Sequence, residues 1–158
     1  MNVFVLDMDL QKCAEYHTDK HVVKMITETA QLLSSAYYST NEETIAPYRL
    51  SHYNHPWAKW ARETVSNWWW LSCLGLALYD EYRYRYGNRH HRAGDLIIYM
   101  RQFPPSVPKG YLTLMPLCMP AECKIGNVVE SYREYYKKYK RDIFNWKERD
   151  EPFWIEGS

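Results

Sequence analysis

Apolar side chains recur with helical spacing through most of the chain. Recurrence at i, i+3 and i+4 places such side chains on one face of a helix, where they can pack against other helices. The pattern predicts helices over residues 13–17, 19–38, 57–86 (with a kink near Gly75), 93–103 and 127–140. We therefore predict an all-α fold, a single compact helical domain of about five helices that spans residues 1–158.

The segments between these helices carry turn-forming residues. Residues 2–6, NVFVL, form a short strand or an extended lead-in, and Asp7 or Asp9 is expected to cap the first helix. Residues 39–56 are predicted to be a loop. Five of the eight prolines fall in residues 104–126, which predicts a long, ordered, Pro-rich loop. A loop of that length in a short chain more often has a function than not.

Charge and apolar run length exclude several classes of protein. The formal net charge is +1, so the whole chain is not expected to attract nucleic acid or an anionic membrane strongly, although a local basic patch is compatible with it. The longest apolar run, around residues 68–78, is broken by Ser72 and Gly75, so no membrane partner is expected. No signal peptide precedes the first helix, which indicates a cytoplasmic protein with four free cysteines and no structural zinc site.

The stretch HTDKHVVKM, residues 17–25, concentrates ionisable groups where an apolar helical pattern begins. At about 100° per residue, His17, His21, Lys24 and Glu28 fall within a stripe about 60° wide, beside the apolar arc. Histidine titrates near neutral pH, so His17 or His21 is a candidate general acid or base. Lys20 and Lys24 are candidate nucleophiles or charge stabilisers.

Asp19 falls inside the apolar arc of the same helix, where an unpaired carboxylate would be costly. One interpretation is that the helix starts here and that Thr18 or Asp19 is its N-cap. The alternative is that Asp19 orients Lys20, His21 or His55 inside a cavity.

His17 and His21 also have the i, i+4 spacing of helical metal ligands, and Glu28, His52 or His55 could be a third ligand. The HExxH pattern of zinc proteases is absent. We therefore expect neither a bound metal nor a cofactor.

A second cluster, SHYNHPWAKWARE, spans residues 51–63. Pro56 suits the first turn of a helix, so Asn54 or His55 is expected to cap it, with Trp57 as a core anchor. Alternatively, this helix start presents Asn54 and His55 to an anion such as phosphate. The candidate ligand-binding residues here are Tyr53, Asn54, His55, Trp57 and Arg62.

A third cluster, EYRYRYGNRHHR at residues 81–92, alternates arginine with tyrosine. This pattern suits phosphate contacts by Arg83, Arg85 and Arg89 together with base stacking, or a solvated helix end whose dipole favours cations. Residues 132–149 repeat the theme, with seven basic side chains against three acidic ones. The fifteen tyrosines and seven tryptophans of the chain are compatible with an aromatic core or with stacking surfaces.

The motifs CAEYHTDKHVVKM, NHPWAKWARE, EYRYRYGNRH, CMPAE and YREYYKKYK, in this order, resemble a family of small proteins carried by tailed phages and some bacteria. The resemblance covers most of the chain. It implies a phage setting, and so the cytoplasm of the host cell, but no particular activity.

A second, more distant resemblance is to the pyrimidine-dimer DNA glycosylases of the endonuclease V type, which are small and all-α. Their Ala-x-x-His element matches Ala14 and His17, and their Asn-His element matches Asn54 and His55. Their aromatic-basic tail is echoed by Trp146 or by the Tyr135-Tyr136 pair. The resemblance implies a nucleic-acid or nucleotide substrate.

The sequence departs from that family in two ways. The family forms an imine between the sugar and an N-terminal amine exposed by methionine removal, but Asn2 is a poor context for that removal. The family's catalytic glutamate also has no evident counterpart after His17. Amine chemistry is therefore expected to fall to a lysine instead.

Our leading hypothesis is an enzyme, encoded by a phage, that acts on a nucleobase or nucleotide, free or in DNA. A non-catalytic module that binds nucleic acid or a host protein, for instance a counter-defence protein, is the first alternative. A metal-dependent hydrolase built on the histidines is the second. Convergence of His17, His21 and His55 on one pocket would favour an enzyme. The sequence carries no feature that sets an oligomeric state.

Overall fold

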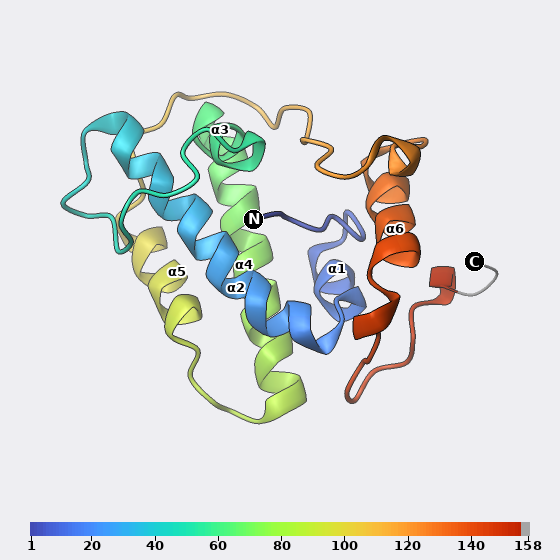
Figure 1. The fold of residues 1–158 in the computed structure, drawn as a ribbon. Coiled ribbons are helices and arrows are strands. Elements are labelled where there is room, and N and C mark those ends of the chain that lie inside the picture. The colour runs from blue at the N-terminus through green and yellow to red at the C-terminus, as the bar shows by residue number, and fades with distance from the viewer. Residues whose placement is uncertain (156–158) are drawn as a thin grey trace.

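The protein is all-α in the computed structural model, which describes residues 1–155 (Figure 1). This confirms the predicted fold class. No strand occurs in those residues, and short 3₁₀ turns join or follow some of the helices. The six α-helices of this part of the chain are α1 (Leu10–Tyr16), α2 (Asp19–Ser35), α3 (Pro56–Glu63), α4 (Val65–Tyr86), α5 (Arg92–Gln102) and α6 (Val128–Tyr139).

The pattern over residues 57–86 is two helices, not one kinked at Gly75. The break falls at Thr64, whose extended backbone (φ −142°, ψ 158°) ends α3 and whose Oγ1 accepts from the Asn67 N–H to cap α4. Threonine is a good N-cap, and hydrophobic spacing alone does not detect a cap inside a continuous pattern. Helix α4 continues through Gly75, where an added Cβ would lie 2.6 Å from Ile97 Cδ1 of α5. Glycine therefore allows α5 to pack closely against α4.

Residues 2–6 form an extended segment that runs between α2 and α6 (Figure 1). Val3, Phe4, Val5 and Leu6 are at most 4 % exposed. Phe4 stacks on His21 of α2 with ring centroids 4.5 Å apart, and on Tyr135 of α6 at 5.8 Å. The start of the chain is thus an apolar wedge between two helices.

This packing corrects the expectation of a solvated polar stripe on α2. His17, His21 and Glu28 are all less than 9 % exposed, and only Lys24 of that stripe reaches solvent. One side of α2 packs on α4, and on the other side His21 is stacked by Phe4 of the N-terminal segment and bonded to the Tyr136 hydroxyl of α6. Replacing His21 would therefore disturb the interior.

Asp19 has neither of the roles expected from the sequence. Thr18 is at the N-cap position of α2 but its side chain makes no capping bond. The Asp19 carboxylate instead accepts from Arg85 Nη1 at 3.0 Å, from Asn145 Nδ2 at 2.7 Å and from the Lys147 N–H at 2.9 Å. A mid-chain residue and the C-terminal segment therefore hold it, rather than its own helix.

Arg85 is the centre of this buried network, which corrects its expected role as a phosphate ligand. Its side chain is fully buried, and its Nε donates to Glu81 at 2.8 Å. Its guanidinium also donates to the backbone oxygens of Glu15 and His17. No donor faces solvent, so Arg85 joins α1, α2 and α4 instead.

Other local predictions are confirmed. Of the two candidates for each cap, Asp9 caps α1 and His55 caps α3 through Nδ1. Asn127, expected inside the last helix, is the N-cap of α6. The cysteines are free thiols. Residues 104–126 form a long loop that crosses over α3 to reach α6, with one 3₁₀ turn at Ala121–Cys123 (Figure 1). None of the helices in residues 1–155 combines the length and apolarity that crossing a membrane requires.

Arg85→Ala is expected to lower the free energy of unfolding by about 3–5 kcal/mol, because it leaves the Asp19 carboxylate buried without its cation. Urea unfolding followed by circular dichroism measures the change. The exposed Arg89 on the same chain segment is the matched control, and Arg89→Ala should change stability by about 0.5 kcal/mol or less. Equal effects of the two substitutions would contradict a structural role for the Arg85 network.

Candidate functional site

The start of the chain lies beside a buried carboxylate. The N-terminal amine of Met1 is 3.4 Å from Glu28 Oε1, and the backbone N–H of Asn2 donates to the same oxygen at 3.0 Å. Lys24 Nζ is 3.7 Å from Glu28 Oε2, and the Lys24 side chain is 69 % exposed. Glu28 thus holds two consecutive nitrogens of the chain start, with a solvated lysine on its other side.

A cavity of about 150 Å³ opens at this amine. It lies where the N-terminal segment, α2 and the C-terminal end of α6 meet. Its lining includes Met1, Phe4, His21, Glu28, Tyr135 and Lys140. Lys140 Nζ lies 5.6 Å from the centre of the Phe4 ring and 5.1 Å from that of Tyr135, within cation–π range. The cavity therefore combines an amine, a carboxylate, an exposed lysine (Lys24), a half-buried lysine (Lys140) and aromatic rings.

His55 approaches the chain start from the loop before α3. Its ring is hydrogen-bonded to the backbone of Met1. Burial, and next the positive charge of the N-terminal amine, lower the pKa of His55. The two motifs singled out in the sequence, around His21 and around His55, thus meet on either side of Met1.

His17 and His21 are unsuited to proton transfer at neutral pH, contrary to the expectation from the sequence. Burial lowers the pKa of His17 to about 4 and that of His21 to about 3. His17 Nδ1 donates to the Cys13 carbonyl at 2.7 Å, and His21 Nδ1 lies 2.6 Å from the Tyr136 hydroxyl. Both rings are therefore neutral, and they serve to join α1, α2 and α6.

The three histidines do not converge on one pocket. Of the three, only His21 lines the cavity. The centre of the His17 ring lies 6.4 Å from that of the His21 ring, and His55 reaches the backbone of Met1. Within residues 1–155, no group of three or more His, Cys, Asp or Glu side chains is arranged to hold a metal ion. Glu28, one of the hypothesised third ligands, faces the amine instead.

The remaining candidates from the sequence lie away from the cavity or are buried. Lys20 and Asn54 are exposed. Trp57 is fully buried, and its Nε1 donates to the Tyr132 hydroxyl, so it is a core residue and not a ligand contact. The guanidinium of Arg62 covers the Tyr53 ring at 3.7 Å.

Arg83 and Arg89 are at the C-terminal end of α4. Arg83 donates to the Tyr79 hydroxyl at 2.8 Å, and Arg89 follows the helix in an exposed turn. Neither lines the cavity at the amine. The arginine-tyrosine alternation is thus explained mainly by packing around α4 and by a solvated helix end.

Sequence reasoning did not place Met1, Tyr135 and Lys140 at the site. Glu28 was part of the polar stripe on α2, and that spacing was the one signal for it. Tyr135 and Tyr136 are neighbours in sequence, yet Tyr135 lines the cavity while Tyr136 is fully buried against His21. Which of two adjacent tyrosines faces a cavity depends on how α6 docks, and this is not encoded locally.

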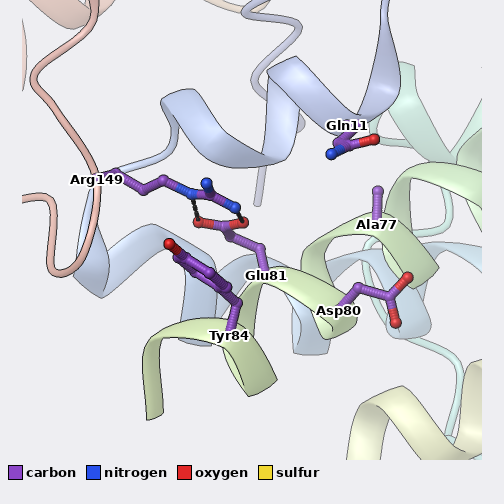
Figure 2. Close-up of a pocket in the computed structure, with 6 residues that line it drawn as sticks. All are labelled: Gln11, Ala77, Asp80, Glu81, Tyr84 and Arg149. Atoms are coloured by element: carbon purple, nitrogen blue, oxygen red, sulfur yellow. Dashed lines mark hydrogen bonds and ion pairs between the residues drawn. The ribbon is translucent and has the colours of Figure 1, made fainter. Parts of the chain in front are cut away.

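A larger cavity of about 280 Å³ lies elsewhere, between α1, α4 and the C-terminal segment (Figure 2). Figure 2 shows Arg149 paired with Glu81 inside it, and the exposed Asp80 also lines it. Tyr84 covers the Arg149 guanidinium at 3.8 Å. The one arginine is already neutralised and Asp80 adds a negative charge, so this cavity is a poor place for a phosphate.

The chain was compared with known proteins. Residues 1–94 match a family model described as pyrimidine dimer DNA glycosylase. The matched residues include Met1, Glu28 and His55, and they end before α6. A search of curated proteins and one of solved structures found no match to the chain.

The buried histidines predict a loss of stability in mild acid. A pKa near 6.5 in the unfolded chain and near 4 and 3 in the fold means that the unfolded state binds more protons below pH 6.5. The stabilising contribution is therefore complete above about pH 6.5 and declines as the pH falls toward 4 and then 3. At pH 5 the free energy of unfolding should be lower by about 2 kcal/mol for each histidine than it is above pH 6.5. Urea unfolding at pH 5 and above pH 6.5 measures this difference.

His17→Gln and His21→Gln should each flatten this pH dependence, because glutamine does not titrate. His52 is exposed and supplies the matched control, so His52→Gln should follow the wild-type profile. Parallel profiles for all three variants would show that the buried rings do not cause the acid sensitivity.

Proposed function

This chain belongs to the family of pyrimidine dimer DNA glycosylases, and from that premise we propose that it excises a damaged base from DNA with its N-terminal amine as nucleophile. The observation that supports this most directly is the position of the amine, 3.4 Å from Glu28 Oε1 at the mouth of a cavity. A carboxylate with an adjacent amine is a nucleophile paired with a group that can accept its proton.

The chemistry follows from this pair. The lone pair of the amine nitrogen forms a bond to C1′ of the sugar, the bond between C1′ and the base breaks, and the base leaves with the electron pair. Glu28 accepts the proton that the amine nitrogen loses. The nitrogen lone pair then forms the second bond to C1′ while the bond between C1′ and the ring oxygen O4′ breaks, O4′ keeps that electron pair and takes the proton back from Glu28, and a protonated imine between protein and opened sugar results. A carboxylate held in a buried position does not need to reorganise for this step.

Either of two residues can carry the reacting amine. If Met1 stays, its own amine is the nucleophile. If Met1 is removed, the nitrogen of Asn2 becomes the amine, and it already lies 3.0 Å from Glu28 Oε1. The size of Asn2 therefore does not decide whether the mechanism works, and Glu28 fills the role of the glutamate that had no evident counterpart in the sequence.

Lys24 is a weaker candidate for the nucleophile. Its side chain is 69 % exposed, while that of Met1 is 4 % exposed. A lysine becomes a good nucleophile when burial or neighbouring cations lower its pKa. Lys24 and Lys140, which line the cavity, instead suit contacts to phosphate, and Tyr135 offers a ring for a base. On the motif resemblance given above, we place this activity in the cytoplasm of a phage-infected or bacterial cell.

Borohydride reduction tests the proposal directly. With a duplex that contains one pyrimidine dimer, the wild-type protein should give a covalent protein–DNA adduct, since borohydride reduces an imine to a stable amine. Mass spectrometry of the labelled peptide should find the adduct on residue 1 or residue 2. Glu28→Gln keeps the shape but removes the proton acceptor, and should slow adduct formation by about 10²-fold or more.

Glu43 is an exposed carboxylate and supplies the control, because Glu43→Gln should trap at the wild-type rate. An adduct on Lys24 alone would replace the amine assignment. Tight binding of the dimer duplex with no adduct would favour the non-catalytic binding module.

A further inference from the structure

The Pro-rich loop presents apolar side chains to solvent next to the candidate site. In residues 110–117, called here the apolar loop, Tyr111 is 91 % exposed and Leu114 is 96 % exposed. Leu112 and Leu117 are also exposed, at 44 % and 36 %. Isolated exposed leucines are ordinary, but four large apolar side chains within seven residues form a patch that requires a partner.

The backbone of the apolar loop is held firmly, so this exposure does not come from a loose segment. Five side chains, from three helices and the turn before α4, bond its main chain at four of its eight residues. Ser66, Thr64, Trp60 and Tyr132 donate to the carbonyls of Gly110, Tyr111, Thr113 and Pro116, and Asn67 accepts from the Thr113 N–H. Residue 113 points inward while residues 112 and 114 point outward, and this alternation holds the apolar side chains in solvent.

The apolar loop is tied to the start of the chain. Asn2 Nδ2 donates to the Cys118 carbonyl at 2.9 Å, one residue beyond the loop. Leu114 lies four positions before Cys118 in the chain, so the Cα atoms of the two residues are at most about 14 Å apart. That distance equals roughly four base steps of DNA. A duplex whose damaged sugar sits at the amine therefore passes within reach of Leu114.

The surroundings suit DNA more than an apolar protein partner. Lys109 directly precedes the loop in sequence, Lys124 follows it by seven residues, and both are exposed. Proteins that insert an apolar side chain between base pairs use such cations to contact the phosphates on either side. An apolar wedge is useful to a glycosylase because its target must leave the base stack before the sugar can be attacked.

We propose that the apolar loop inserts Leu114, supported by Tyr111, into the duplex beside the damaged step and so opens the base stack for the N-terminal amine. This inference rests on the proposed function, since the duplex that Leu114 enters is the substrate of that amine. The insertion buries two side chains that are otherwise almost wholly in water, which offsets the cost of unstacking.

The test compares Leu114→Ala and Tyr111→Ala with the wild-type protein on two substrates. One is a duplex with a pyrimidine dimer and 2-aminopurine at the neighbouring step, and the other is the same dimer in single-stranded DNA. The wild-type protein should raise 2-aminopurine fluorescence on binding the duplex. Leu114→Ala should abolish the rise and lower adduct formation on the duplex by about tenfold or more. Its loss on single-stranded DNA, which needs no unstacking, should be several-fold smaller.

Ile98 on α5 is an exposed apolar residue outside the loop, 41 % exposed, and Ile98→Ala should behave like the wild-type protein on both substrates. Equal losses on duplex and single strand, or an unchanged fluorescence rise in Leu114→Ala, would overturn the wedge. So would sedimentation that shows a dimer dissociated by Leu114→Ala, since the patch would then join two copies of the chain. Failure of the proposed function is distinct, because it removes adduct formation from the wild-type protein while the fluorescence rise still reports insertion.

Discussion

The insertion of residues 3–6 between α2 and α6 is the packing interaction on which the rest of the structure depends. Four apolar side chains that are at most 4 % exposed bring an extended segment into the interior, and hydrophobic burial of this extent holds it there. The same insertion buries the polar stripe of α2 and carries the N-terminal amine to Glu28. Without this segment, that side of α2 would face water and the chain start would have no fixed position.

A second constraint joins the two ends of the chain to its middle. The Arg85 guanidinium, fully buried, bonds Asp19 and the backbone of α1, while Glu81 also receives Arg149 from the C-terminal segment. Each charge in this group has a partner, as a buried charge requires. The network thereby fixes the C-terminal segment against α1 and α4. Because Glu81 neutralises Arg149, the cavity between these elements is acidic and poorly suited to DNA (Figure 2).

The groups to which we assign the chemistry lie at a different cavity from the one in Figure 2. The amine, Glu28, the exposed Lys24 and the half-buried Lys140 lie at one cavity, and Asn2 beside it is bonded to Cys118, the residue that follows the apolar loop. The proposed nucleophile is thus held by α2 and the proposed wedge by α3, α4 and α6, helices of one packed structure. A nucleophile and a wedge that must act on one duplex need such a fixed spacing.

The sequence by itself determined the helices that have strong periodicity, the long Pro-rich loop and the all-α fold, and it narrowed two helix caps to Asp7 or Asp9 and to Asn54 or His55, because spacing and capping are local properties. It also placed Glu28 in one stripe with His17 and His21 and related the chain to DNA glycosylases. Only the tertiary structure decided that this stripe is buried, that Arg85 pairs with Asp19, that Tyr135 rather than Tyr136 faces the cavity, and that the N-terminal amine meets Glu28. These are contacts between segments 26 to 126 residues apart, and they depend on how whole elements dock, which no local pattern specifies.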